Sequence, residues 1–249
     1  MTATTTLGRV LRGCAASLAT VVGLAALPSP NTAWSAESVA ELTPTAQLSA
    51  LFPRSEAFDF DPPAPGSYAL PPLKIAPDGA VLDHRARDLR LANILDGRIS
   101  LVSFIYLLCS DEQGCPLALS TLFDIHQMSA YAPGLREDVQ LVTLSFDPER
   151  DTPEAIDSFA YPIQMDREAD KKLDWHVLTT RDLTTLQPIL DGFGQAVDRS
   201  GNDDTIQHLL RLFLVDRQGR IRNIYGLGMI DPRLLMTDVE TLLIEERTQ

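Results

Sequence analysis

The chain has 249 residues, of which 45% are apolar and 22% are charged, and its formal net charge is −13. This length favours one medium-sized domain with additional segments, and the composition excludes collagen-like, low-complexity and wholly disordered chains. No nucleic-acid partner is expected, because phosphate binding needs clustered positive charge and the chain has no run rich in lysine or arginine.

Residues 1–36 have the order of charged and apolar residues that is typical of a secretory signal peptide. They contain no Asp or Glu, and Arg9 and Arg12 precede an apolar stretch from Gly13 to Leu27. This stretch is shorter than the roughly 20 residues that span a bilayer, so an uncleaved membrane tether is the less favoured interpretation. We expect cleavage near residue 36 and a mature protein that is periplasmic or otherwise exported.

The mature chain keeps two of the three cysteines, Cys109 and Cys115, in a C-x5-C spacing. Export places them in an oxidising compartment, where a disulfide can persist. A chain of this length does not need one short-loop disulfide to hold its core together. The pair is therefore expected to have a chemical role.

Residues 37–72 form a predicted leader that holds seven of the seventeen prolines. Such a density excludes helix interiors and central strands, so an extended segment is expected. The domain itself is predicted over residues 73–249. It begins with a short hairpin, in which residues 73–75 and 80–82 flank a Pro77-Asp78-Gly79 turn.

The remaining pattern predicts strands and helices in alternation. The run ISLVSFIYLL, residues 99–108, is typical of a strand that is buried on both faces. The later elements, in chain order, are a helix over 115–132, a strand over 139–146, a helix over 152–161, a strand over 175–178, a helix over 182–193, a hairpin of 209–215 with 220–226, and a closing amphipathic helix. This order predicts an α/β fold, a thioredoxin-like mixed sheet flanked by helices with an N-terminal hairpin extension.

The two cysteines occupy the sheet edge at which open α/β folds bind ligands. Cys109 ends the first buried strand, and Cys115 precedes a proline at a helix N-terminus, whose partial positive charge stabilises a thiolate. Thiolates are soft donors that suit Cu(I), zinc or iron. Two of them either chelate one ion or oxidise to a disulfide, so the pair alone leaves both chemistries open.

A third metal ligand has to come from one of the four histidines. His84 lies in a charged stretch and is expected to be solvated, and His126 is expected to pack at the edge of the core. His176 begins a predicted strand, where a structural role is expected. His208 directly precedes the buried strand 209–215, at a sheet edge from which a loop can bring it toward the cysteines.

Three segments of the chain resemble the Sco/SenC family of copper chaperones. YLLCSDEQGCPLALSTL resembles the family's cysteine motif, and LVTLSFDPERDTPEAI resembles its strand and the S-x-D-P-x-R-D-T-P segment that follows. DTIQHLLRLFLVDRQGRIRNIYG resembles its metal-binding histidine segment, including Phe213, Gly219 and the closing Tyr225-Gly226. The resemblance extends over about residues 73–247.

By this resemblance Cys109, Cys115 and His208 take the positions of the family's copper ligands, for Cu(I), Cu(II) or both. The resemblance implies an exported copper metallochaperone rather than an enzyme. It would deliver copper to the copper centre of a respiratory cytochrome oxidase, with a copper-receiving oxidase subunit or another copper protein as its partner. The chain departs from the family in a cysteine loop that is two residues longer, and in Gln207 and Leu209, which flank the histidine.

Two other functions would use the same cysteines. A thiol-disulfide oxidoreductase with Cys109 and Cys115 as its redox-active pair would keep a partner's metal-binding cysteines reduced, without any need for His208. Thioredoxin-type enzymes carry a cis-proline before the strand that faces the active site, whereas no proline occurs between Pro188 and Pro232. A structural or sensor domain would use the disulfide only to fix a loop.

The other residues of these motifs are expected to be structural. Asp151 or Thr152 is expected to cap the helix that follows, and Arg150 to pair with an acidic neighbour. Met165 and Met229 are expected to fill the core or a loop rather than to serve as further soft ligands.

Overall fold

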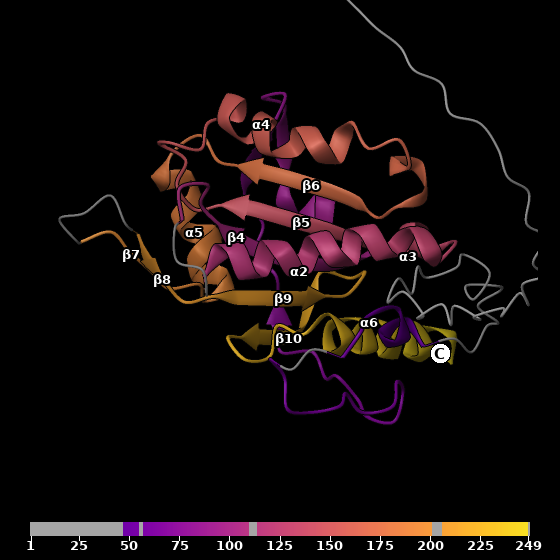
Figure 1. Cartoon of the computed structure of the whole chain (residues 1–249). Coiled ribbons are helices and arrows are strands. Elements are labelled where there is room, and N and C mark those ends of the chain that lie inside the picture. The colour runs from indigo at the N-terminus through magenta and orange to yellow at the C-terminus, as the bar shows by residue number, and fades with distance from the viewer. Residues whose placement is uncertain (1–46, 55–56, 110–113, 201–205, 249) are drawn as a thin grey trace, which may run out of the picture. The chain divides into compact units, whose positions relative to one another are not determined.

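The computed structural model describes residues 47–54, 57–109, 114–200 and 206–248. The predicted signal peptide, residues 1–36, lies outside the described residues, as does the first part of the predicted leader. The described chain forms an eight-stranded mixed sheet with helices on both faces, which confirms the predicted α/β class (Figure 1). No helix within the described ranges combines the length and apolar character that crossing a membrane requires.

The strands are short at the two ends of the sheet and longer in its centre. They are β1 (Lys74–Ile75), β2 (Ala80–Asp83), β3 (Asp88–Arg90), β4 (Ile99–Ile105), β5 (Val139–Ser145), β6 (Asp174–Thr179), β7 (Val197–Asp198), β8 (Gln207–His208), β9 (Arg211–Val215) and β10 (Arg220–Gly226). The order in the large sheet is β1-β10-β9-β4-β5-β6-β2-β3, and β7 and β8 form a separate two-stranded ribbon.

The helices connect and cover these strands. They are α1 (Leu91–Leu95), α2 (Cys115–Met128), α3 (Leu135–Asp138), α4 (Pro153–Gln164), α5 (Leu183–Phe193) and α6 (Pro232–Arg247), with the 3-10 turns η2 (Leu48–Leu51), η3 (Ser129–Tyr131) and η4 (Ala169–Lys171). The four longest helices and the long strands fall where the sequence pattern predicts them, with ends displaced by a few residues.

The centre of the sheet is the parallel trio β4, β5 and β6. Every residue of β4 and of β5 is buried, as expected for strands with helices on both faces. The connection from β4 to β5 contains α2, so the first crossover begins at the end of β4. Cys109 and Cys115 therefore lie at the carboxyl edge of the central strands.

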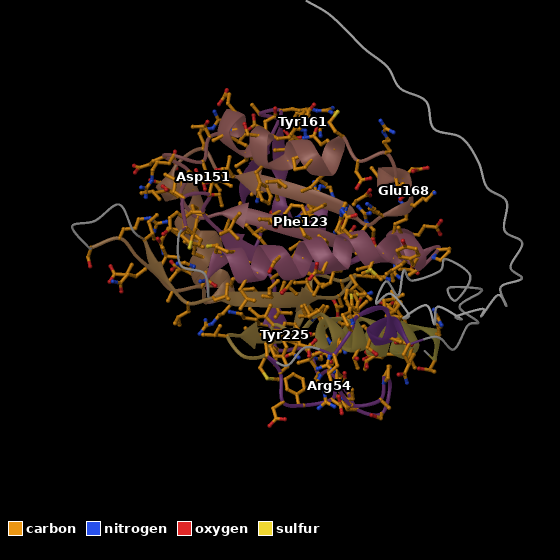
Figure 2. All side chains as sticks on the ribbon, viewed as in Figure 1. Arg54, Phe123, Asp151, Tyr161, Glu168 and Tyr225 are labelled. Atoms are coloured by element: carbon orange, nitrogen blue, oxygen red, sulfur yellow. The ribbon has the colours of Figure 1, made fainter. Side chains whose placement is uncertain are left out.

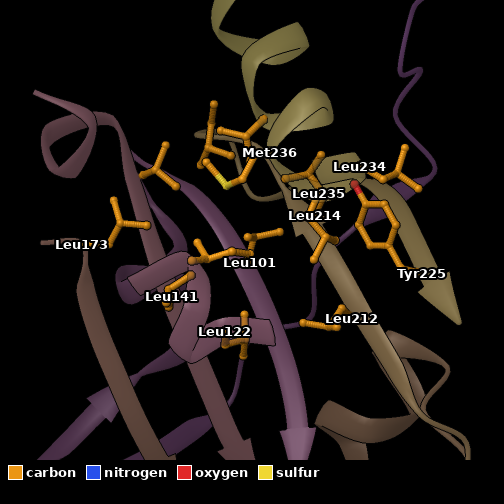
Figure 3. Close-up of a cluster of buried hydrophobic side chains, with 14 of the residues drawn as sticks. Leu101, Leu122, Leu141, Leu173, Leu212, Leu214, Tyr225, Leu234, Leu235 and Met236 are labelled. Atoms are coloured by element: carbon orange, nitrogen blue, oxygen red, sulfur yellow. The ribbon is translucent and has the colours of Figure 1, made fainter. Parts of the chain in front are cut away.

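Two apolar clusters hold the helices to the two faces. On one face α2 and α6 pack on the sheet, with Leu122, Leu235 and Met236 against Leu101 and other residues of β4, β5 and β9 (Figure 3). On the other face α1 and α5 cover the same strands through a second cluster. Figure 1 shows α2 in front of the sheet and α5 behind it. The burial of apolar side chains on both faces of the sheet fixes the orientation of the central strands, including β4, which leads to Cys109.

The predicted hairpin of residues 73–75 with 80–82 is wrong. β1 pairs with β10 and β2 pairs with β3 and β6, so the two segments lie at opposite ends of the sheet. The N-terminal hairpin is instead formed by β2 and β3. Asp78 does not close a turn, because its carboxylate accepts hydrogen bonds from the backbone N–H groups of Gly79 and Ala92 and pairs with Arg90. These bonds tie the segment to the start of α1.

The described residues of the proline-rich leader pack along α6. The side chains of Phe52 and Leu70 are buried in the core cluster beneath that helix. The Tyr68 hydroxyl donates to Asp238, and Arg233 forms an ion pair with Asp61 at 3.3 Å. This segment thus covers a helix that itself lies against the sheet.

Candidate metal centre

Cys109 and Cys115 flank the loop between β4 and α2, as the sequence predicts. After β4 the chain turns at Tyr106, whose carbonyl accepts a hydrogen bond from the Cys109 N–H at 3.3 Å. Cys115 is the first residue of α2, and Pro116 suits the first turn because it lacks an N–H that would otherwise be unpaired there. Cys115 is buried, Cys109 is half-buried, and both thiols are free.

His208 comes to the same place from a distant part of the chain. It lies on β8, opposite Val197 of β7, and its Nε2 atom is 3.4 Å from the sulfur of Cys115. Its Nδ1 atom is 3.1 Å from the carbonyl oxygen of Ile206. A carbonyl only accepts hydrogen bonds, so Nδ1 carries the proton and the lone pair of Nε2 faces the thiol. This is the tautomer in which an imidazole binds a metal through Nε2.

The three side chains fit a single small ion. The two sulfurs and a ring nitrogen of His208 all lie within 4.8 Å of one another. Donors that share one ion lie at most about 4.6 Å apart, because metal–sulfur bonds are about 2.3 Å long. Small side-chain adjustments therefore bring all three to bonding distance. In the described ranges this is the one group of three or more such side chains that meets the spacing of a metal site.

Aromatic rings enclose the histidine. The ring of Phe146 lies 4.8 Å from that of His208, and the ring of Tyr106 lies 5.8 Å away in an edge-on arrangement. Tyr106 is buried, and the side chain of Cys109 neighbours its hydroxyl. Sequence patterns assigned Tyr106 and Phe146 only to strands, since nothing in an apolar run distinguishes a core ring from one that faces a ligand.

Burial also sets the protonation of these groups. It raises the pKa of Cys115, and the neighbouring Cys109 raises it further. Burial and Cys109 likewise raise the pKa of Tyr106. Without a metal ion the Cys115 thiol is therefore protonated and donates toward Nε2 of His208. A metal ion that binds here replaces this proton, so binding is coupled to proton release.

A recess opens beside the histidine. It has a volume of about 390 Å³, and its walls include Gly114, His208, Leu209, Arg211, Gly226 and Leu227. The two leucines are more than half exposed, at 53% and 58%. Loops at a sheet edge with such an opening are accessible to another molecule.

The other three histidines lie apart from the cysteines. His126 on α2 is buried against Trp175, with 5.6 Å between ring centres, in the packing role predicted for it. His176 lies half-buried within β6, and its Nε2 atom is enclosed without a hydrogen bond. His84 differs from the expected solvated residue, because it is half-buried and its Nε2 atom is enclosed without a hydrogen bond. His84 and His176 line a different recess, which includes Arg98 just before β4.

Two of the residues in the DPERDTP segment have the structural roles that the sequence predicts, and Asp151 has a different one. Thr152 is the N-cap of α4, where its hydroxyl accepts from the N–H of Ala155 at 3.4 Å. Arg150 pairs with Asp147, as expected. Asp151 is not the cap. Its carboxylate instead accepts from the N–H of Leu107 at 3.0 Å, two residues before Cys109.

Comparison with known proteins identifies relatives over most of this domain. The SCO1/SenC family profile matches residues 80–243. The SCO1 protein homolog of Bacillus subtilis strain 168 is 28% identical over 135 residues, which are 53% of this chain and 64% of the relative. The alignment thus spans less than two thirds of that relative's length.

Solved structures share the fold. Bradyrhizobium japonicum ScoI with copper bound superposes with a TM-score of 0.50 at 20% identity, over 66% of this chain and 97% of its own. BsSco, a member of the Sco family of cytochrome c oxidase assembly proteins in which a disulfide switch was identified, gives 0.54 at 21% identity, over 68% and 94%. These similarities confirm the thioredoxin-like architecture that the sequence predicts.

Proposed function

Because the chain belongs to the SCO1/SenC family, we propose that it is an exported metallochaperone that binds copper through Cys109, Cys115 and His208 and delivers it to the copper centre of a respiratory cytochrome oxidase. One observation carries this proposal. Three soft or borderline donors from two segments 93 residues apart converge within 4.8 Å. Core packing alone does not require two free thiols and an imidazole lone pair to face one another.

The chemistry of the donors suits copper. Two thiolates and one imidazole make a soft site of low coordination number that holds Cu(I) and, with the imidazole, Cu(II). The Ile206 carbonyl supports this role, because it fixes the histidine with Nε2 as the free donor. Each thiol that binds the ion gives up its proton.

Delivery to a partner is supported by the position of the site. Cys109 is half-buried and lies in a loop, and the recess next to His208 is open to solvent. A receiving protein can therefore approach the ion and exchange its own ligands for these one at a time. Export is supported by the signal-like pattern of residues 1–36.

The second function that these residues support is thiol-disulfide exchange. The two free sulfurs lie within 4.8 Å of each other, so little movement separates them from a disulfide. Such an enzyme would keep the metal-binding cysteines of a partner reduced. It would not need the imidazole of His208, and this difference separates the two functions.

Anaerobic titration of the reduced protein with Cu(I), in competition with a chelator, tests the proposal. We expect one ion per chain, and a large loss of affinity in Cys109→Ser, Cys115→Ser and His208→Ala. His84→Ala is the matched control, since this histidine lies in a different recess. Unchanged affinity in Cys109→Ser or His208→Ala would refute the ligand assignment.

An insulin-reduction assay tests the alternative on the same set of proteins. Rapid turnover that requires both cysteines and is unaffected by His208→Ala would favour the oxidoreductase. Negligible turnover by a protein that binds copper tightly would favour the metallochaperone.

A further inference from the structure

The ladder between β4 and β5 stops at an unusual acceptor. Ile105 is opposite Ser145, and the N–H of Phe146 donates to the carbonyl of Ile105 at 2.8 Å. In a regular parallel ladder the next bond would run from the N–H of Leu107 to the carbonyl of Phe146. Leu107 instead donates to Oδ2 of Asp151 at 3.0 Å. A carboxylate oxygen thus takes the place of the backbone acceptor, and the chain leaves the sheet at this point.

The carboxylate of Asp151 is itself held firmly. Its residue is 2% exposed, and the hydroxyl of Ser145 donates to the same Oδ2 atom at 2.6 Å. The N–H of Asp151 donates to the carbonyl of Asp147 at 2.8 Å, which fixes the backbone of the DPERDTP segment. Figure 2 labels Asp151 near the ends of the central strands. The acceptor for Leu107 is therefore a built part of the fold.

The carbonyl that Leu107 leaves free has its own partner. The guanidinium of Arg199 donates to the carbonyl oxygen of Phe146. Arg199 directly follows β7, the strand that pairs with His208 on β8. Phe146, just after β5, is thus bonded to the end of β4, which leads to Cys109, and to the end of β7, the strand that pairs with the histidine strand β8.

We propose that Asp151 is a positioning residue for Cys109. By holding the N–H of Leu107 it fixes the turn that presents the Cys109 sulfur, two residues later, to Cys115 and His208. The part of this inference that concerns copper rests on the proposed function, whereas the part that concerns the turn does not. Other residues take the two structural roles that Asp151 could have in this segment. Thr152 caps α4, and Asp147 is the ion-pair partner of Arg150.

The test compares Asp151→Ala and Asp151→Asn with Asp238→Ala. Asp238 is as buried as Asp151, at 1%, but it accepts from Tyr225 and Asn223, away from the cysteine loop. Two measurements use the reduced, metal-free protein: hydrogen exchange of the Leu107 amide by NMR, and the rate at which iodoacetamide alkylates each cysteine. A third measures Cu(I) affinity by competition.

In Asp151→Ala we expect the Leu107 amide to exchange about tenfold faster and Cys109 to be alkylated faster than in the wild type. Copper affinity should fall about tenfold or more. Asp151→Asn keeps an acceptor oxygen for Leu107, so it should remain close to the wild type in all three. It also keeps the test decisive if Asp151→Ala does not fold. Asp238→Ala should change none of the three.

Leu107 exchange and Cys109 alkylation that match the wild type in a folded Asp151→Ala protein would overturn the proposal. So would equal changes in Asp238→Ala, or an Asp151→Asn protein whose Leu107 amide is unprotected. A wild-type protein that does not bind copper would refute the proposed function alone, since amide exchange and alkylation still measure whether Asp151 holds the turn.

Discussion

The Nε2 atom of His208 lies 3.4 Å from the sulfur of Cys115, although 93 residues separate the two in the chain. The contact depends on a buried scaffold, because Cys115 begins a helix on the sheet and His208 belongs to a ribbon bonded to the end of β5. Some parts of that scaffold should therefore matter for metal binding, and others only for stability.

The Tyr106 hydroxyl should tune the site without being a ligand. It neighbours the side chain of Cys109, and a hydroxyl that donates to a metal-bound sulfur weakens that sulfur as a donor. Tyr106→Phe should therefore shift the thiolate-to-Cu(II) absorption band and lower the reduction potential of bound copper, with copper still bound. Absorption spectra and redox titration check this. Tyr131→Phe, at an exposed position, is the control, and an identical spectrum in Tyr106→Phe would contradict the prediction.

The Phe146 ring should support the histidine as well as the core. Phe146→Ala removes a fully buried ring that contacts His208, so it should cost about 3–5 kcal/mol of unfolding free energy and also weaken copper binding. Phe193→Ala removes an equally buried ring that packs on Phe104 instead. It should lose similar stability and keep its copper affinity. Urea unfolding and Cu(I) competition distinguish the two, and equal affinity losses would show that Phe146 has no special role.

The cap of α4 should affect stability alone. Thr152→Ala removes the hydroxyl that accepts from Ala155, at a cost of about 1 kcal/mol. The hydroxyl of Thr152 bonds within the first turn of α4, so copper affinity should not change. Thermal unfolding with a parallel Cu(I) competition measures both quantities. A drop in affinity comparable to that of Asp151→Ala would mean that the whole segment acts through its stability.

Asp83 should contribute stability that is lost in acid. Burial acts to raise the pKa of Asp83, but hydrogen bonds from the backbone and guanidinium of Arg87 and from the Arg85 N–H lower it below its usual value. A carboxyl with a lowered folded-state pKa stabilises the fold above its unfolded pKa of about 3.9, and this contribution disappears as the pH falls through the folded-state pKa.

The difference in unfolding free energy between wild type and Asp83→Asn should therefore be largest near pH 7 and should shrink below about pH 4. Urea unfolding across this range measures it. Asp88→Asn is the control, because Asp88 pairs with Arg181 at the surface, and it should show little effect at any pH. A loss in Asp83→Asn that is constant with pH would contradict the prediction.

The sequence predicted those parts of the fold that depend on local pattern. Continuous apolar runs identified β4 and β5, and the position of His208 before a buried strand placed it at the correct sheet edge. The hairpin across Pro77-Asp78-Gly79 failed because Asp78 forms bonds to Arg90 and Ala92, and such distant partners leave no mark on a local turn pattern.

The surroundings of the site were less predictable for the same reason. Phe146 and Tyr106 differ from other core rings only in facing His208, which is a result of tertiary packing. Asp151 has the residue type and the position expected of a helix cap, yet its neighbour Thr152 caps α4. The DPERDTP motif marks Asp151 in the sequence. The bond between its carboxylate and the N–H of Leu107, however, depends on the parallel pairing of β4 with β5.

X-ray absorption at the copper edge tests the central claim most directly. In the Cu(I)-loaded wild-type protein we expect two sulfur neighbours at about 2.3 Å and one nitrogen neighbour at about 2.0 Å. The nitrogen neighbour should disappear in His208→Ala, and one sulfur neighbour should disappear in Cys109→Ser. A wild-type spectrum with sulfur neighbours alone, or a nitrogen neighbour that persists in His208→Ala, would contradict the account.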